Sequence, residues 1–291
     1  MSANVVRGAI VLAGGRSTRM GRDKATLPWG EPGGTLLGHV VRVLLDVVDD
    51  VVVVARRTQQ LPELPEVVRV AHDDVEDEGP LRGLLAGLRA TRASSVYASG
   101  CDTPWLRRAF VEALFDAQPA GGIAIATSEG FAHPLAAVYP SDAADDVAAL
   151  LAAGRRRPID LLDRRTTVRV DETVLRRVDP ELASLDNLND PARFEAAHAR
   201  QVVPDVHIEL FERARQLAGT AAGWVPGRTA REALAAAARR WPALVPSVLG
   251  ADGTPARTYG VSVGGRDFLR DLDAPLADGE ALVLVDALSG G

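Results

Sequence analysis

The sequence has little cysteine and no long hydrophobic run. Cys101 is the one cysteine among 291 residues, which excludes an internal disulfide and a metal site built from several cysteines. No apolar run approaches the ~20 residues that a membrane-spanning helix needs. The first residues also lack the basic region and cleavage site of an export signal. We therefore expect a cytoplasmic protein with no membrane partner.

Lysine is nearly absent. Among 33 basic residues Lys24 is the one lysine, and the others are arginine. An ammonium group on a flexible stem can follow a moving phosphate, whereas a guanidinium is a planar fork, so we interpret Lys24 as functional. The net charge of −6, with acids and arginines interspersed, argues against a nucleic-acid partner. The arginine runs 155–157 and 164–165 are typical of solvated faces, although a phosphate-bearing substrate could use them.

Strand and helix patterns alternate up to about residue 202. Continuous valine-rich runs are typical of strands that are buried on both faces of a mostly parallel sheet. The pattern predicts a doubly wound α/β domain over residues 1–202, which would bind ligands at the carboxyl ends of its strands. Thr35 is the expected N-cap of its first helix. The expected strands are 8–13, 51–55, 67–71, 96–99 and 123–127, and the expected helices are 36–48, 81–93 and 106–117.

The pattern changes after Pro204. Residues 203–291 are predicted to form a small α+β domain, which is large enough to fold alone. Apolar residues recur on one stripe of its helix, and Thr229 is the expected N-cap. The expected elements are a helix at 230–240 and strands at 206–211, 259–263 and 281–285.

The first expected strand leads into a glycine-rich loop. Gly14 and Gly15 leave backbone N–H groups open to an anion, and Arg19 and Lys24 add positive charge. The loop fits neither G-x-G-x-x-G nor G-x-x-x-x-G-K-[ST], which argues against a dehydrogenase and a P-loop ATPase. We predict a triphosphate site here.

Asp102 follows the fourth expected strand, at the same edge of the sheet as the glycine-rich loop. Magnesium usually takes one or two carboxylates together with phosphate oxygens and waters, so Asp102 is a candidate Mg²⁺ ligand. It could instead cap the helix that follows. Cys101 beside it is interpreted as a small buried residue and not as a nucleophile.

Five segments, in this order, resemble the molybdenum cofactor guanylyltransferases. The resemblance covers about residues 5–200 and implies transfer of GMP from GTP, with Mg²⁺, to the phosphate of molybdenum-molybdopterin. Pyrophosphate leaves and no protein nucleophile is needed. The segments are 12–24 (Leu-Ala-Gly-Gly-x-x-x-Arg-Met-Gly-x-Asp-Lys), 79–83 (Gly-Pro-Leu-x-Gly), 101–104 (Cys-Asp-x-Pro), 133–135 (His-Pro-Leu) and 187–191 (Asn-x-Asn-x-Pro).

The resemblance also implies roles for single residues. Lys24 would contact the phosphates, Arg19 would neutralise charge on the triphosphate, and Asp102 would bind Mg²⁺. Asn187 and Asn189 would line the acceptor or metal side. The residues implied to bind the nucleotide are Leu12, Ala13, Gly14, Gly15, Lys24, Asp73 and Asp102, and those implied in catalysis are Arg19, Lys24 and Asp102.

Two stretches depart from that family. Its members often have asparagines after the second strand, whereas residues 54–57 read Val-Ala-Arg-Arg, so one expected nucleoside contact is missing or moved. The neighbouring acids Asp73 and Asp74 leave the register of the acidic contact open by one residue. Both departures bear on the identity of the base more than on the type of reaction.

The sequence ends in Gly290 and Gly291, a slim tail that could thread a partner channel and expose its carboxylate. Together with segments 211–215, 229–242 and 275–280, it resembles the small sulfur-carrier subunit of molybdopterin synthase. That family has a ubiquitin-like β-grasp fold and carries sulfur as a thiocarboxylate on its last glycine. The resemblance implies two partners, the large synthase subunit and an adenylating enzyme. Asp286 departs from the apolar residue or proline common there.

Three alternatives stay open. Cytidylyltransferases of the same cofactor tend to have Leu-Ala-Ala-Gly and to lack the Gly-Pro-Leu turn that residues 79–81 carry. Sugar-phosphate nucleotidyltransferases usually show Gly-x-Gly-Thr-Arg, which is absent. A non-catalytic scaffold for the sulfur carrier is disfavoured by the intact Lys24 and Asp102.

Overall fold

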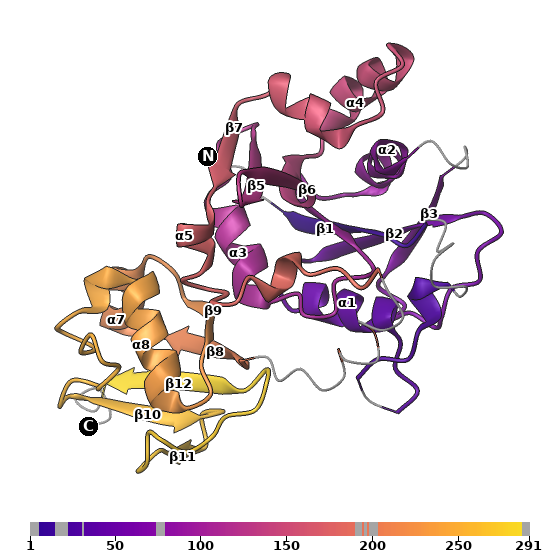
Figure 1. Ribbon diagram of the computed structural model, residues 1–291. Coiled ribbons are helices and arrows are strands. Elements are labelled where there is room, and N and C mark those ends of the chain that lie inside the picture. Colours follow the sequence, from indigo (N-terminus) through magenta and orange to yellow (C-terminus); the bar gives the residue numbers. More distant parts are fainter. Residues whose placement is uncertain are drawn as a thin grey trace. The chain divides into compact units, whose positions relative to one another are not determined.

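The computed structural model describes residues 6–14, 23–30, 32–73, 79–189, 194, 197 and 203–286. The chain divides into two compact units, of which the first holds residues 1–172 and 182–200 and the second holds 173–181 and 201–291 (Figure 1). The sequence pattern places a boundary at 202/203 and does not indicate that 173–181 groups with the second unit. No helix among the described residues is long and apolar enough to cross a membrane.

The first unit is built on a mostly parallel sheet, which confirms the predicted α/β class. Over the described residues its strand order is β3-β2-β1-β4-β6-β5-β7, and β6 runs antiparallel to both of its neighbours (Figure 1). The strands are β1 (Arg7–Leu12), β2 (Asp50–Arg56), β3 (Arg69–Asp73), β4 (Ser95–Gly100), β5 (Ile123–Ser128), β6 (Phe131–Pro140) and β7 (Thr167–Val170). The helices are α1 (Leu36–Leu45), α2 (Pro80–Ala90), α3 (Arg108–Asp116) and α4 (Ala143–Ala152), with 3-10 turns η1 (Lys24–Thr26), η2 (Pro158–Asp163) and η3 (Ala183–Leu185).

Helices cover both faces of this sheet, so its strands are apolar on both sides. Helices α2 and α4 pack on one face, with Ile10 and Leu12 of β1 beneath them, and α1 and α3 lie on the other (Figure 1). A Cβ atom on Gly87 of α2 would lie 2.6 Å from Cγ2 of Ile10, so glycine is required for this close approach. On the other face, the Thr35 hydroxyl accepts a hydrogen bond from Gly38 N at 3.2 Å, which confirms the predicted N-cap.

Strand β6 is an element that the sequence did not predict, because it contains Pro134. Residues 133–136 of β6 oppose the single residue Ala126 of β5, so the proline sits in a bulge and breaks no regular ladder. The Tyr139 hydroxyl donates to the Pro134 carbonyl at 2.8 Å and holds the bulge in place. The 133–135 motif therefore lies on a distorted strand.

The second unit has a five-stranded sheet in the order β11-β10-β12-β8-β9. Its two central strands, β8 and β12, are parallel, and α8 packs its alanine- and leucine-rich face into the core. Thr229 caps α8 by accepting from Glu232 N at 3.3 Å, as predicted. The elements are α5 (Glu172–Leu175), which spans the division between the units, β8 (Asp205–Leu210), α7 (Glu212–Ala218), β9 (Ala222–Pro226), α8 (Ala230–Arg240), η4 (Pro242–Leu244), β10 (Tyr259–Val263), β11 (Asp267–Phe268) and β12 (Ala281–Asp286).

Candidate active site

The strand order reverses at β1, which lies between β2 and β4. In doubly wound sheets the carboxyl edge at such a point is where ligands bind. The pairing sets Leu12 of β1 opposite Gly100 of β4, and Cys101 N donates to the Leu12 carbonyl at 3.2 Å. The glycine-rich loop and the Asp102 turn therefore leave the sheet side by side, as their sequence positions predicted.

The Asp102 carboxylate is folded back over the end of β4. A Cβ atom on Gly100 would lie 2.5 Å from Asp102 Oδ1, so only glycine leaves room for it. The Thr103 hydroxyl donates to the Gly100 carbonyl at 3.2 Å and closes the turn. This turn directs the carboxylate toward the glycine-rich loop.

Lys24 bridges three distant parts of the first unit. Its Nζ donates to Asp102 Oδ2 at 2.7 Å and to Asn189 Oδ1 at 2.5 Å. The side chains of Lys24 and Asp102 are 17% and 19% exposed, so the pair is shielded yet within reach of a ligand. The structure thus brings together Lys24, Asp102 and Asn189, three residues that the sequence placed in the site.

A small aromatic cluster holds the Asn189 segment in place. Leu188 N donates to the Asp102 carbonyl at 2.8 Å. The Leu188 side chain is buried with Leu36 of α1, and Trp29 and Trp105 pack against them with ring centroids 6.0 Å apart. This anchoring explains how Asn189 reaches the lysine from 165 residues away.

The donors at this edge are hard oxygen atoms. The Asp102 carboxylate and the Asn189 amide oxygen are the kind of ligand that Mg²⁺ prefers, with phosphate oxygens completing the shell. The described residues contain no group of three or more His, Cys, Asp or Glu side chains that could hold a metal ion by themselves. The site therefore fits a metal that arrives with a phosphate ligand.

The first residues of the glycine-rich loop are already engaged by the protein. Ala13 N and Gly14 N both donate to the Val54 carbonyl, at 2.9 and 3.2 Å. Their N–H groups therefore point into the sheet and do not form the predicted anion nest. Gly15 and Arg19, which belong to the same prediction, lie outside the described residues.

Gln59 joins the two ends of that loop, although no sequence motif singles this residue out. Its Nε2 donates to the Ala13 carbonyl at 3.0 Å and to Asp23 Oδ2 at 2.8 Å. The other oxygen of Asp23 accepts from Ala25 N at 3.0 Å and caps the turn that carries Lys24. Gln59 lies three residues after the end of β2. This position at the carboxyl edge of the sheet was the one sequence signal that could have indicated its role.

Asp73 ends β3 at the same edge of the sheet. In the register of β2 and β3 it lies opposite Arg56, two strands away from β1. Asp73 therefore lies apart from the place where Lys24, Asp102 and Asn189 meet. It would contact a different part of an extended ligand.

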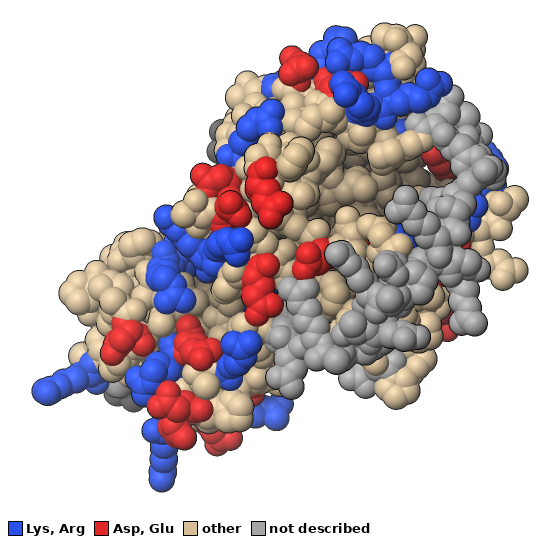
Figure 2. Space-filling view, in the orientation of Figure 1, with Lys and Arg blue, Asp and Glu red and all other residues tan. Residues whose placement is uncertain are grey.

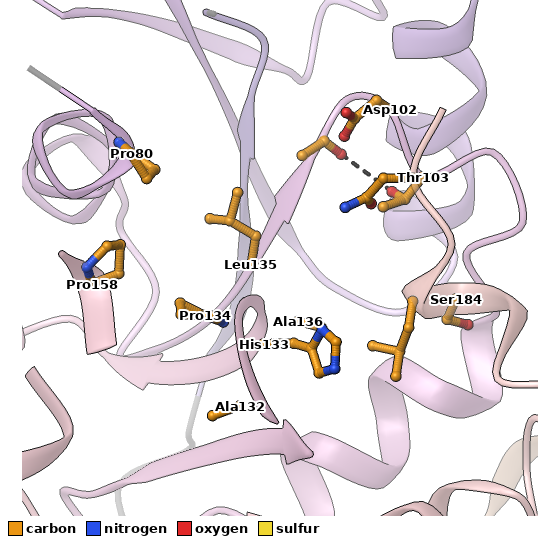
Figure 3. A pocket seen from close by; sticks show the side chains of 13 residues that line it. Pro80, Asp102, Thr103, Ala132, His133, Pro134, Leu135, Ala136, Pro158 and Ser184 are labelled. Carbon is orange, nitrogen blue, oxygen red and sulfur yellow. Dashed lines mark hydrogen bonds between the residues drawn. The ribbon is translucent and has the colours of Figure 1, made fainter. Parts of the chain in front are cut away.

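A pocket with a volume of about 300 Å³ adjoins Asp102. Figure 3 shows Pro80 and Pro158 on one side of it, Asp102, Thr103 and Ser184 on the other, and His133 and Pro134 between them. The volume is at the lower end of what small-molecule sites occupy. Pro80 belongs to the 79–83 motif and His133 to the 133–135 motif, so the pocket unites two segments that the sequence singled out.

Two titratable groups here are kept neutral. Burial, reinforced by the charge of Asp102, raises the pKa of the Cys101 thiol to about 12, which confirms a buried residue and excludes a thiolate nucleophile. Burial also lowers the pKa of His133, whose Nε2 lies 2.7 Å from the Ser128 hydroxyl. His133 therefore offers a neutral ring to the pocket.

Residues 9–168, more than half of the chain, match the sequence profile of the MobA-like NTP transferase domain. The chain belongs to this family. It is therefore a nucleotidyltransferase.

One relative and one solved structure agree with this assignment. A probable molybdenum cofactor guanylyltransferase of Mycolicibacterium paratuberculosis is 36% identical over 205 residues, which are 69% of this chain and all of that protein. The molybdopterin-guanine dinucleotide biosynthesis protein A of Archaeoglobus fulgidus is 26% identical, with a TM-score of 0.54 over 66% of this chain and 97% of that one. SAMP1 of Haloferax volcanii is 29% identical, with a TM-score of 0.27, over 30% of the nucleotidyltransferase and 99% of SAMP1.

Proposed function

We propose that the first unit transfers GMP from GTP to the terminal phosphate of molybdenum-molybdopterin. The observation that carries this proposal is the position of Lys24 Nζ, held between Asp102 and Asn189 where the strand order reverses. The relative that is 36% identical and named a probable molybdenum cofactor guanylyltransferase supports the choice of donor and acceptor.

The reaction needs no group on the protein that forms a bond. An oxygen of the acceptor phosphate forms a bond to the α-phosphorus of GTP, and the bond from that phosphorus to the bridging α–β oxygen breaks. Pyrophosphate leaves with the electron pair. The attacking oxygen is already anionic near neutral pH, so no general base is required. Catalysis then consists of positioning and of neutralising charge.

Lys24 and Asp102 neutralise each other in the ligand-free protein. When the triphosphate binds, the flexible lysine stem lets Nζ turn from the carboxylate to the phosphates and follow the charge that builds on pyrophosphate. Bound Mg²⁺ would supply further positive charge to the phosphates, with Asp102 and Asn189 as its protein ligands.

The 300 Å³ pocket is the part of the site that suits the acceptor. Its mixed walls, with polar groups from Asp102, Ser184 and Asn187 and apolar ones from prolines and alanines, fit a ring system that carries a phosphate. Figure 2 shows a hollow in this unit with basic residues gathered above it, over α4 and the chain that follows. There Arg155 and Arg157 each donate to the buried Asp160 at 2.9 Å.

We further propose that the second unit is a sulfur carrier of the β-grasp type. A parallel central pair, β8 and β12, flanked by the antiparallel strands β9 and β10 and packed against α8, supports this fold. A carrier would bear its thiocarboxylate on the glycine that follows Gly290. Gly290 and Gly291 lie outside the described residues. The partners would be the large synthase subunit and an adenylating enzyme.

A nucleotide panel tests the transferase. The full-length protein is incubated with Mg²⁺, molybdenum cofactor and either GTP, CTP or ATP, and the dinucleotide product is identified by mass spectrometry. We expect the guanine dinucleotide and the highest kcat/KM with GTP. A preference for CTP would make the protein a cytidylyltransferase. Transfer to a sugar phosphate in place of the cofactor would contradict the proposed acceptor, molybdenum-molybdopterin.

The intact mass tests the carrier. Protein made together with an adenylating enzyme and a sulfur source should gain the mass difference between sulfur and oxygen on its last residue. Deleting Gly290 and Gly291 should abolish this gain while nucleotidyl transfer continues. If the gain never occurs, and the shortened protein still supports molybdopterin synthesis as sole carrier, the second unit is not a sulfur carrier.

A further inference from the structure

Arg56 occupies the edge of the sheet between the glycine-rich loop and Asp73. It is the last residue of β2 and lies opposite Asp73 of β3 in the pairing register. Its Cγ is 3.7 Å from the position that a Cβ atom on Gly14 would take, so the aliphatic stem runs along the start of the loop. The stem of Arg56 thus lies beside the start of the glycine-rich loop, and its backbone lies opposite Asp73.

The surrounding residues hold Arg56 in place without using its guanidinium fully. Its backbone N donates to Gln59 Oε1 at 3.2 Å. Its Nε is buried and has no hydrogen-bond partner among the described residues. Among the described residues, the carboxylate oxygen Asp23 Oδ2 is 3.8 Å from Nη2, beyond hydrogen-bond range, and it already accepts from Gln59.

A buried donor without a partner is unfavourable and calls for an explanation, of which a missing ligand is one. Nε itself is inaccessible, but the side chain of Arg56 as a whole is 33% exposed, so a ligand at the sheet edge can reach part of it. A planar fork of donors with a fixed stem is suited to two adjacent acceptors in one plane.

We propose that Arg56 reads the base of the donor nucleotide by donating to O6 and N7 of guanine. Guanine presents these two acceptors side by side, whereas adenine and cytosine each present an amino donor that would face the guanidinium donors. The preference then has an attractive part for guanine and a repulsive part against the other bases.

This inference rests on the proposed use of GTP, and binding measurements separate the two. Calorimetric titration of the full-length protein with GTP, 7-deaza-GTP, ATP and CTP gives the ratios of Kd without any transfer. We expect wild type to bind GTP about 10- to 100-fold more tightly than 7-deaza-GTP, which lacks the N7 acceptor. Arg56→Gln, which keeps the stem beside Gly14, should bring that ratio to within about threefold, and Arg56→Ala should do the same.

Arg57→Ala is the matched control, because Arg57 is the exposed neighbour of Arg56. It should leave the ratio unchanged. If both Arg56 variants weaken all four nucleotides by the same factor, Arg56 acts on the phosphates or on the loop and the inference is overturned. If wild type prefers CTP, or binds GTP but makes no guanine dinucleotide, the proposed function fails instead.

Discussion

An aspartate and an arginine lie side by side at each edge of the strand pair β2 and β3, Asp50 with Arg69 at the amino edge and Arg56 with Asp73 at the carboxyl edge. The two edges differ in how these residues are hydrogen-bonded. At the amino edge, Asp50 accepts from Arg69, from the Thr91 hydroxyl at 2.6 Å and from Arg92 N at 2.8 Å. At the carboxyl edge, Arg56 keeps a buried Nε without a partner among the described residues. The amino edge is closed by the protein itself, whereas the carboxyl edge keeps one buried donor that the described residues leave unpaired.

The pKa of Asp50 shows what closing an edge achieves. Burial favours the neutral acid, but hydrogen bonds from Arg69, Thr91 and Arg92 outweigh it and hold the pKa of Asp50 below its usual value. A buried charge that is fully paired stabilises the folded state relative to the same charge left alone. The comparison teaches that the polar groups of Asp50 at the amino edge are paired within the protein, whereas Nε of Arg56 at the carboxyl edge is unpaired among the described residues.

Removing the lysine at the carboxyl edge should give the largest effect. Lys24→Ala should lower the single-turnover rate of transfer by roughly 100-fold, about 3 kcal/mol, because one preorganised donor to the developing charge is lost. Asp102→Asn should reduce both activity and the affinity for Mg²⁺. Rapid-quench kinetics at saturating GTP measures the rate of transfer, and isothermal titration calorimetry measures the affinity for Mg²⁺.

Asp116→Asn is the control for this pair. It breaks the ion pair with Arg7, 3.1 Å long and exposed, at the amino end of β1. The rate should stay at the wild-type value. Wild-type turnover in folded Lys24→Ala and Asp102→Asn proteins would place the active site elsewhere.

Breaking the hydrogen bonds of Asp50 at the amino edge should have the next largest effect, and it should act on stability. Asp50→Asn should destabilise the first unit by about 2 kcal/mol, since Arg69 loses its charged partner, and lower its Tm by about 4–8 °C. The folded variant should transfer nucleotide at the wild-type rate. Scanning calorimetry of Asp50→Asn against Asp49→Asn, an exposed neighbour, measures the effect.

The same variant has a defined pH dependence. Because the folded-state pKa of Asp50 is lowered, its contribution is present above the unfolded value of about 3.9 and is lost as pH falls through the folded value. The Tm curves of wild type and Asp50→Asn should therefore converge in acid. A constant difference between pH 7 and pH 2 would contradict the ion-pair explanation.

His133 should give a smaller effect on stability. Burial lowers its folded-state pKa, so the unfolded chain takes up a proton first as pH falls below about 6.5, and wild type should lose stability from there downward. His133→Gln should flatten this decline, as thermal scans from pH 8 to pH 5 would show. His72→Gln, at an exposed position, should leave it unchanged; equal slopes in both variants would contradict a buried neutral His133.

Substituting Cys101 should have almost no effect on the rate of transfer. With a pKa of about 12 its thiol stays protonated near pH 8, so a thiol reagent should modify it only after unfolding. Cys101→Ala should keep the transfer rate within about twofold, because no thiolate takes part. Rapid labelling of the folded protein would show that the β4 turn is open.

Much of the site could be inferred from the chain alone, because strand ends and turns are local. Apolar runs indicated β1, β2 and β4, and the carboxyl edge of a parallel sheet follows from that pattern. The glycine-rich loop and the Asp102 turn were placed together for this reason. Strand β6 was missed, because its proline is tolerated only through a bulge that its neighbour β5 accommodates.

The sequence by itself determined strands β1 to β4, the doubly wound class of the first unit and the residue types that suit phosphate and metal. Only the tertiary structure decided which of them meet. Asn189 reaches Lys24 across 165 residues because buried Leu188 anchors it, and Gln59 closes the loop because β2 ends beside β1. Such contacts depend on packing between distant segments, and no local pattern encodes the free energy of that packing. The same holds for Arg56, whose buried Nε becomes significant only through its neighbours.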